Sequence, residues 1–317
     1  MKGALQVGSL TAARGQKTTG FLEVPGMTAR MPLTLVNGVK EGPTLLITAG
    51  IHGGEYASIE AAIRVAAALD SGEVSGRIIL VPLVCPEAFH ARVQYVLPAD
   101  GKNVNRQFPG KVLGTVSERI AHTVVSHAAS QADAWIDLHG GDIHEALVPV
   151  VGYLEEGEPS VQARARAMAE VFGIEYVIHP KDLPGTTFKT AAALGIPCII
   201  AEAGQRGELD GASIDRLVRG CTNVARHLGI LPGKPEQGVP LSVFRDYPWT
   251  RAEHAGCWYP AVQIGALVRK GQPIGVIKDY FGNTMAEYKA PADGMVLLLA
   301  TSLAINVGDP LFGLGIA

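Results

Sequence analysis

The sequence contains no long hydrophobic run. None of its apolar stretches approaches the ~20 residues that a membrane-spanning helix requires. The N-terminal segment, MKGALQVGSLTAARG, has an apolar part that is too short and too broken to resemble a secretory signal. We therefore expect a cytoplasmic protein that has no membrane partner.

Cysteine is scarce as well. The four cysteines lie far apart and form no Cys-x-x-Cys pair, the spacing that is typical of structural zinc sites and of dithiol redox sites. Cys85 and Cys198 lie within apolar runs. We expect buried free thiols in preference to disulfides or metal ligands.

Charge is also sparse, at 18% of the residues, and the net charge is -3. The 27 lysines and arginines are dispersed and form no long basic run. Since nucleic-acid-binding proteins usually present a basic patch, we expect no nucleic-acid partner. The length of 317 residues, of which 47% are apolar, fits one large domain and a smaller one.

The sequence does contain a regular alternation of apolar strands and amphipathic helices. Strands are predicted at residues 43–49, 77–84, 134–138 and 197–201. Helices are predicted at residues 58–69, 117–132, 159–172 and 213–228. Strands that are apolar throughout indicate an α/β sheet covered on both faces, and the first 30 or so residues should add β-structure at an edge.

The character of the sequence changes at the Pro/Gly cluster of residues 231–235, which has the composition of a linker. We therefore divide the chain into a catalytic α/β domain, residues 1–235, and a small all-β domain, residues 236–317. The glycine pattern of the second domain resembles the barrel-sandwich folds of biotinyl and lipoyl carriers. Because Lys289 is the lysine nearest the turn that a carrier would modify, a role as a lid or dimer contact is the better interpretation.

Two short segments carry most of the chemistry. His52 and Glu55 follow one predicted strand in a glycine-rich loop, and His139 directly follows another. Functional sites in open α/β sheets assemble at the carboxyl ends of strands. Two imidazoles and one carboxylate are the ligand set of an open catalytic zinc site, although either histidine alone would more often simply end a strand.

Acidic residues near these ends have two interpretations each. Asp137 lies on the same face of its strand as His139 and either orients that imidazole or bonds to backbone amides. Glu202 ends another apolar strand. It is our candidate general base for hydrolysis, and the alternative is an ion pair with Arg206.

A polar loop at residues 100–110 contains the adjacent residues Asn105 and Arg106. Guanidinium groups bind carboxylates through two parallel hydrogen bonds, and an asparagine adds a directional donor. In isolation this would be a turn with a solvated arginine. Near a metal site it becomes a candidate substrate clamp.

Together these segments resemble the succinylglutamate desuccinylase/aspartoacylase family, which belongs to the zinc carboxypeptidase clan. The motifs that carry the resemblance are His52-Gly-Gly-Glu55, Asn105-Arg106-x-Phe108-Pro109-Gly110, Asp137-Leu138-His139 and Glu202-Ala-Gly. Each motif is common, but their combination in this order is specific. The resemblance covers most of the chain and implies a mixed sheet flanked by helices, followed by the C-terminal β domain that many members carry.

The resemblance also implies the activity. Members hydrolyse an amide bond and typically release an acyl group from an N-acylated amino acid. His52, Glu55 and His139 would then bind one zinc ion per chain, although such ligands also accept other divalent metals. Glu202 would be the general base and then the proton donor to the leaving amine.

The substrate would be a small molecule whose α-carboxylate is held by Asn105 and Arg106. Many members have an acidic residue where this chain has Asn103, and an upstream arginine that polarises the scissile carbonyl. No arginine lies at the matching distance in this chain. The stretch before the loop supplies Arg92 and Tyr95 instead. We name Arg92 as the catalytic candidate that acts from a shifted position; the alternative is that zinc and another donor alone hold the oxyanion.

The substrate itself is less defined by the sequence. Asp142 and Glu145, after the third ligand, would favour an amino group over a second carboxylate, although loop acids are more often solvated. The alternative functions are a metallocarboxypeptidase acting on short peptides and a binding protein without catalysis. A homo-oligomer is compatible with the sequence.

Overall fold

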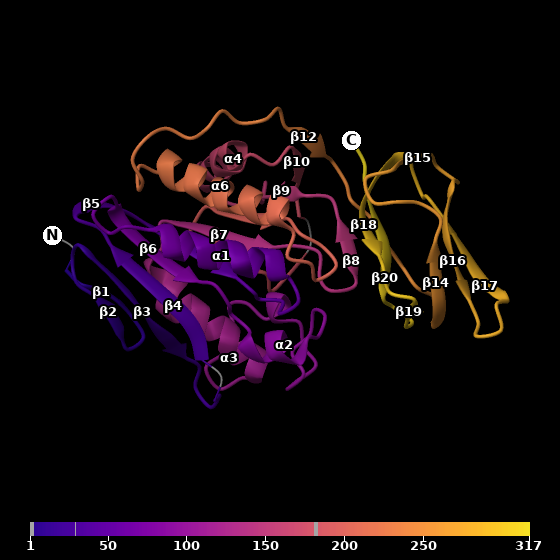
Figure 1. Cartoon of the computed structure of the whole chain (residues 1–317), viewed down its shortest axis with the longest axis horizontal. Coiled ribbons are helices and arrows are strands. Elements are labelled where there is room, and N and C mark those ends of the chain that lie inside the picture. Colours follow the sequence, from indigo (N-terminus) through magenta and orange to yellow (C-terminus); the bar gives the residue numbers. More distant parts are fainter. Residues whose placement is uncertain (1–2, 29, 181–182) are drawn as a thin grey trace.

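The structure, a computed structural model, describes residues 3–28, 30–180 and 183–317. A nine-stranded mixed sheet with helices on both faces forms the larger part, and an antiparallel β region follows it (Figure 1). This architecture confirms the predicted α/β fold with a C-terminal all-β region.

The large sheet has the strand order β12-β10-β9-β11-β7-β5-β6-β4-β3. In chain order its strands are β3 (Gln16–Glu23), β4 (Arg30–Asn37), β5 (Lys40–Ala49), β6 (Ser75–Val81), β7 (Ala134–His139), β9 (Val150–Gly152), β10 (Tyr176–Ile178), β11 (Cys198–Glu202) and β12 (Ser242–Phe244). The four strands β6, β5, β7 and β11 run parallel at the centre. Every residue of β7 is buried, which explains its nearly continuous apolar sequence.

The N-terminal residues form β-structure at an edge, as predicted. β3 is the edge strand of the large sheet and pairs antiparallel with β4. A separate hairpin pairs β1 (Leu5–Val7) with β2 (Leu10–Ala12). Its apolar side chains belong to the same core as those of the helices at residues 86–91, 116–123 and 187–193.

Helices cover both faces of the sheet (Figure 1). One face carries α1 (Tyr56–Ala68), α4 (Pro159–Phe172) and α6 (Gly211–His227). The other face carries α2 (Pro86–Ala91), α3 (Val116–Thr123) and α5 (Thr187–Ala193). The predicted helix at 117–132 is α-helical only to Thr123, after which the chain continues as a π-helical turn, Val124–Ala128, and a 3-10 turn, Ala129–Gln131. Among the described residues, no helix has both the length and the apolarity needed to span a bilayer.

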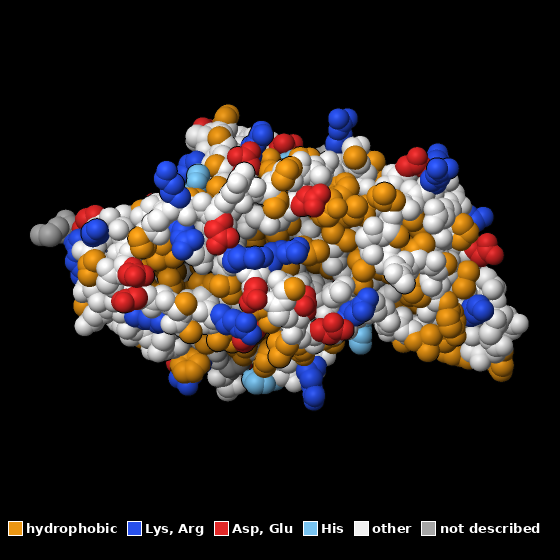
Figure 2. All heavy atoms as spheres, turned by 45° about the horizontal axis from the view of Figure 1, so that its top comes forward, with side chains coloured by type: hydrophobic (Ala, Val, Ile, Leu, Met, Phe, Trp, Pro, Cys, Tyr) orange, Lys and Arg blue, Asp and Glu red, His pale blue; other side chains and the backbone are white. Residues whose placement is uncertain are grey.

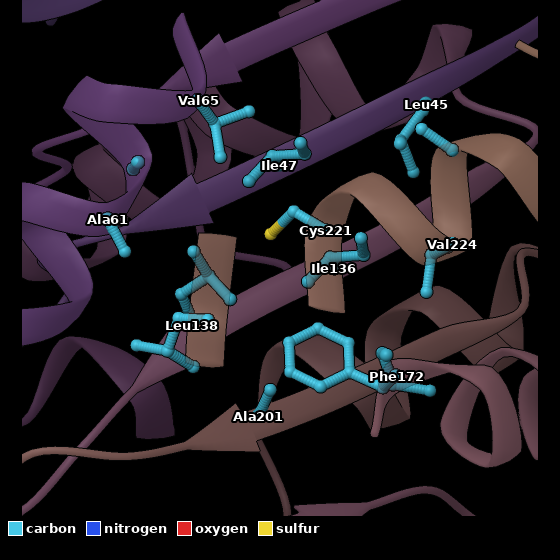
Figure 3. Packing of buried hydrophobic residues seen from close by; sticks show 14 of the residues in the cluster. Leu45, Ile47, Ala61, Val65, Ile136, Leu138, Phe172, Ala201, Cys221 and Val224 are labelled. Carbon is cyan, nitrogen blue, oxygen red and sulfur yellow. The ribbon is translucent and has the colours of Figure 1, made fainter. Parts of the chain in front are cut away.

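The core under α1, α4 and α6 is tightly packed (Figure 3). Ile136 and Leu138 of β7 face these helices, and Phe172 lies beside them. A Cβ atom at Gly220 of α6 would collide with the Phe172 ring, so the glycine lets α4 and α6 approach closely. Asp210 accepts hydrogen bonds from the backbone N–H groups of Ala212 and Ser213 and so caps α6.

The C-terminal region contains two small antiparallel sheets around its own core. Their strands are β13 (Trp249–Arg251), β14 (Gly256–Pro260), β15 (Leu267–Val268), β16 (Pro273–Lys278), β17 (Thr284–Lys289), β18 (Gly294–Ala300), β19 (Ala304–Ile305) and β20 (Pro310–Gly315). Two strands cross the expected division of the chain at residue 235. β12 joins β10 of the large sheet, and β8 (Glu145–Leu147) pairs with β18 of the C-terminal region.

The surface carries both signs of charge. On the face shown in Figure 2, basic and acidic side chains are interspersed, and hydrophobic side chains gather toward the end formed by the C-terminal region. Tyr280 and Phe281, at the turn before β17, are among the exposed apolar residues. A dimer contact through this region stays a prediction.

Replacing Phe172 by alanine should destabilise the fold by ~3–5 kcal/mol, because the side chain is 1% exposed and its removal leaves a cavity between α4 and α6. Phe281→Ala is the matched control, since that ring is 91% exposed. Urea unfolding measures both free energies. A loss at Phe172 as small as that at Phe281 would contradict this account of the core.

Candidate active site

Three buried side chains meet at the carboxyl ends of two parallel strands. His52 and Glu55 lie in the loop between β5 and α1, and His139 is the last residue of β7. β5 and β7 are neighbours in the sheet, with Ala49 opposite Leu138. This register brings the loop and the strand end together, as expected for an open α/β sheet.

Glycines allow the first loop to turn and pack closely. Gly50 has a φ of +63°, a conformation that favours glycine. At Gly54 a side chain would collide with the carboxylate of Asp142. The loop between β5 and α1 is therefore compact enough to direct both His52 and Glu55 inward.

Glu55 lies between the two imidazoles. Its Oε1 atom is 2.6 Å from Nδ1 of His52, and its Oε2 atom is 3.0 Å from Nδ1 of His139. The two imidazole rings have centroids 5.0 Å apart. Burial raises the pKa of Glu55, but the charges of His139 and His52 outweigh it and lower that pKa to about 2.

The donor set fits a metal ion. One nitrogen or oxygen atom from each of His52, Glu55 and His139 lies within 4.8 Å of the others. Oε2 of Glu55 is buried and 3.0 Å from Nδ1 of His139, but among the described residues it has no partner with the geometry of a hydrogen bond. A buried carboxylate oxygen without a partner is costly, and a cation held by all three side chains would satisfy it.

Asp137 contacts His139, as one of its two predicted roles requires. Its Oδ2 atom is 3.0 Å from Nε2 of His139. The same carboxylate accepts hydrogen bonds from the hydroxyls of Thr48, at 2.7 Å, and Thr187, at 2.5 Å. Carboxylate partners of this kind fix the ring orientation of metal-binding histidines.

Glu202 stands beside this group. It ends β11, where it lies opposite His139 in the parallel pairing with β7. Burial raises the pKa of Glu202 to about 8; the charge of His139 opposes this shift, and the charges of Glu55 and Asp137 reinforce it. Arg206 is exposed, and among the described residues no ion pair joins it to Glu202.

Asn105 and Arg106 lie in a short 3-10 helix, Val104–Arg106. Asn105 is buried, and its Oδ1 atom accepts a hydrogen bond of 3.1 Å from the backbone N–H of Thr187. Arg106 is partly exposed, and its guanidinium donates to the carbonyl oxygen of Asn105. Asn103, just before the helix, has its Oδ1 atom 3.1 Å from Nε2 of His52.

A cavity of about 460 Å³ opens beside these residues. Its lining includes the cluster of His52, Glu55 and His139 together with Glu202 and Arg106. The C-terminal region supplies further wall residues, including Tyr247, Trp249 and Arg251. The volume is that of a site for a small organic molecule.

Residues 41–228 match the model of the succinylglutamate desuccinylase/aspartoacylase catalytic domain. This chain belongs to the succinylglutamate desuccinylase/aspartoacylase family. The match spans the strands and loops that carry the cluster, Asn105, Arg106 and Glu202.

Relatives within this family extend the likeness to nearly the whole chain. The N-alpha-acetyl-L-2,4-diaminobutyric acid deacetylase of Halomonas elongata is 30% identical over 307 residues, which cover 92% of this chain and 89% of the relative. The product-bound ectoine utilization protein EutE (DoeB) of Ruegeria pomeroyi has a TM-score of 0.87 at 28% identity and covers 95% of both chains. A succinylglutamate desuccinylase from Silicibacter sp. TM1040 has a TM-score of 0.85 at 26% identity, over 95% of this chain and 94% of that one. The deacetylase and the desuccinylase are both hydrolases that remove an acyl group from an amino acid derivative.

Of the two residues expected upstream of the polar loop, Arg92 and Tyr95, only Tyr95 lines the cavity. Arg92 is exposed at the end of α2, and the cavity is lined instead by Tyr95 and Val96 of the same segment. Tyr95 packs edge-on against His52, with ring centroids 5.9 Å apart. For this family member, the segment therefore brings a phenol and no guanidinium to the cavity.

Asp142 and Glu145 are buried, although loop acids are usually solvated. Glu145 lines the cavity and accepts a hydrogen bond from the Tyr95 hydroxyl. Asp142 accepts one from the Tyr95 backbone N–H, at 3.1 Å. The sequence predicted no contact for Thr187, which lies in a stretch expected only as a rim of the site, and no role for Arg251. Neither residue lies in a motif, and each reaches the site only through tertiary packing.

Glu145→Gln should weaken the pH dependence of stability in the metal-free protein. Burial raises the pKa of Glu145 from 4.5 to about 8; the Asp142 amide opposes this shift, and the charges of Glu55 and Glu202 add to it. Between these two values the folded protein keeps a proton that the unfolded chain has lost. The stabilisation is therefore complete below pH ~4.5 and declines as the pH rises toward 8.

Urea unfolding from pH 5 to 8 measures this slope. Each pKa unit corresponds to about 1.4 kcal/mol, so the Glu145 carboxyl accounts for up to a few kcal/mol of the decline. Glu287→Gln, at an exposed position, is the matched control. Identical slopes for wild type and Glu145→Gln would show that Glu145 titrates normally.

Proposed function

We propose that this protein is a zinc-dependent amidohydrolase that removes the acyl group from a small N-acylated amino acid or a related amine. The observation that carries the proposal is the buried cluster of His52, Glu55 and His139 in the lining of a cavity. The activities of the named relatives support the reaction class.

One zinc ion per chain would be held by the two imidazoles and the Glu55 carboxylate. Three protein ligands leave a coordination position open, as catalytic zinc requires. When bound, zinc supplies a Lewis acid that polarises a carbonyl and lowers the pKa of water toward ~7. Asp137 keeps the His139 ring in the orientation that binding requires.

Glu202 would move the proton in both halves of the reaction. It would accept the proton of the attacking water and return it to the amide nitrogen as the amine leaves. Its place beside His139 and its raised pKa of about 8 support this role, because a general base works best when its pKa is near the operating pH.

Asn105 and Arg106 would bind the α-carboxylate of the substrate. Arg106 lines the cavity, and among the described residues no carboxylate forms an ion pair with it. Asn105 also lines the cavity; the Thr187 backbone fixes its Oδ1 atom, and its Nδ2 atom lies 3.5 Å from Nε2 of His139. The guanidinium is therefore available to bind an anion through two parallel hydrogen bonds.

The C-terminal region would restrict the substrate to small molecules. Trp249 and Arg251 of β13 form part of the wall. A wall on this side leaves less room for a peptide chain, so the deacylase reaction is favoured over that of a carboxypeptidase. We therefore propose a lid-like role for the C-terminal region.

Purified protein should contain about one zinc ion per chain, and Glu202→Gln should retain that zinc while kcat falls by about 10²–10⁴-fold. Mass spectrometry with plasma ionisation measures the metal. A panel of N-acetyl and N-succinyl amino acids with basic, neutral and acidic side chains measures the activity. The panel also tests whether an amino group is preferred to a second carboxylate.

The exposed Glu208→Gln variant is the matched control and should keep wild-type activity. Removal of zinc by a chelator should abolish activity, and added zinc should restore it. A protein that takes up no metal and hydrolyses no member of the panel would refute the proposed function and favour a binding role.

Arg106→Lys should raise KM about tenfold or more and change kcat little, because lysine cannot form the two parallel hydrogen bonds. The effect should vanish for substrates whose α-carboxylate is replaced by a carboxamide. Arg219→Lys, on the exposed face of α6, is the control. An equal rise in KM for acid and amide substrates would assign Arg106 a different role.

A further inference from the structure

The cavity contains a tyrosine next to the metal cluster that the proposed reaction does not yet use. Tyr95 lines the cavity and packs edge-on against His52. Glu202 lies beside His139, the other imidazole of the cluster, and lines the same cavity. A substrate carbonyl at the cluster would therefore have both a base and a phenol in the cavity lining.

The backbone of Tyr95 is held in an uncommon conformation. Its φ is +58°, in the left-handed region that side chains other than glycine rarely adopt. The Tyr95 N–H donates to Asp142, which is itself fixed by the Ile143 amide at 2.7 Å. Strained residues persist only where the surroundings over-determine them, and they concentrate at functional sites.

The hydroxyl of Tyr95, like its backbone N–H, is hydrogen-bonded to a buried acid. It bonds to Glu145, a side chain that is 3% exposed and whose Oε2 atom accepts from the Asp142 amide at 3.3 Å. Glu145 begins β8, which pairs with β18, so Ala300 lies opposite it. Asp142, Glu145 and the pairing of β8 with β18 therefore together hold the Tyr95 side chain in place.

The proposed reaction also requires a hydrogen-bond donor for the carbonyl oxygen of the substrate. Acyl transfer places negative charge on the carbonyl oxygen, and a preorganised hydrogen-bond donor stabilises that charge. Arg92, the nearby cation of the same segment, is exposed and does not line the cavity. The Tyr95 hydroxyl is the donor that this segment contributes.

We propose that Tyr95 donates a hydrogen bond to the carbonyl oxygen of the scissile amide, and that Glu145 and Asp142 are its positioning residues. This inference rests on the proposed deacylase function. As the water oxygen bonds to the carbonyl carbon, the π electron pair moves to the carbonyl oxygen. Tyr95 keeps its proton throughout, and its hydrogen bond strengthens. When the C–N bond breaks, the nitrogen takes its proton from Glu202.

The state of Glu145 supports this role. Burial raises the pKa of Glu145 to about 8, so near neutral pH its carboxyl is largely protonated. In the structure the Tyr95 hydroxyl donates to Glu145. When a substrate is present, the phenol hydrogen can turn from Glu145 to the carbonyl oxygen, because a neutral carboxylic acid can in turn donate to the phenol oxygen.

Tyr95→Phe should lower kcat by about 10²–10³-fold, the usual loss for one oxyanion donor, with KM within about threefold of wild type. Zinc content should be unchanged. Tyr280→Phe, at a position that is 87% exposed, is the matched control and should keep wild-type kinetics. A Tyr95→Phe enzyme with wild-type kcat would overturn the inference.

A transition-state analogue separates catalysis from packing. A phosphonate analogue of the N-acetyl substrate should bind Tyr95→Phe more weakly by the same factor that kcat/KM has lost, whereas the amino acid product should bind as in wild type. Equal weakening of both ligands would indicate a structural role and would overturn the inference.

The positioning residue supplies a second test that does not require the Tyr95 variant to fold. Glu145→Ala should lower kcat in the direction of Tyr95→Phe, and Glu145→Gln should restore most of that loss because its amide can donate to the phenol oxygen. Equal loss in both variants would contradict the positioning role. A wild-type enzyme inactive on every substrate would refute the proposed function, whereas an active wild type with an equally active Tyr95→Phe refutes this inference alone.

Discussion

The approach of two imidazoles to one buried carboxylate is the constraint on which the rest of the site depends. A carboxylate that is 3% exposed, as Glu55 is, costs several kcal/mol unless charged or donating groups surround it. His52 and His139 can surround it only because β5 and β7 are parallel neighbours in a fixed register. A slip of one residue would turn His139 to the opposite face of the sheet. The apolar interior of the sheet, which fixes that register, is therefore part of the site.

This dependence explains how much could be predicted from the sequence. His139 and Glu202 end strands, and His52 follows one, so the apolar runs were enough to place all three at one edge of the sheet. The same runs predicted the four parallel strands at the centre of the large sheet and four of the six α-helices that the structure describes. One of these helices, expected to reach residue 132, changes its winding after Thr123. Contacts between loops had no such signal. Tyr95 was recognised only as a neighbour of Arg92, because its orientation depends on acids about 50 residues further along the chain.

The C-terminal region could be recognised as all-β from its glycines, but its role in the cavity could not. Two short strands cross the division expected at residue 235. β12 lies after it but extends the large sheet, and β8 lies before it but extends a sheet of the C-terminal region. Strand pairs of three residues leave no periodicity in the sequence. Their consequence is large, since Glu145 at the start of β8 is held by β18 while its carboxylate reaches Tyr95. The geometry of the cavity therefore depends on the docking of both parts of the chain.

The acidity of the cavity accounts for a neutral donor in place of a cation. Besides Glu55 and Glu202, the acids Asp142 and Glu145 are gathered near the cluster, and their pKa values are raised by burial to about 6 and about 8. An arginine at position 95 would form ion pairs with Asp142 and Glu145, and its charge would be largely neutralised before substrate arrived. A tyrosine donates without a charge of its own to be neutralised. In the low-dielectric surroundings of a protein cavity, an oriented neutral donor stabilises a developing oxyanion more strongly than it would in water. In the proposed mechanism the buried acids act through the phenol that they hold, and Arg106 would bind the carboxylate of the substrate.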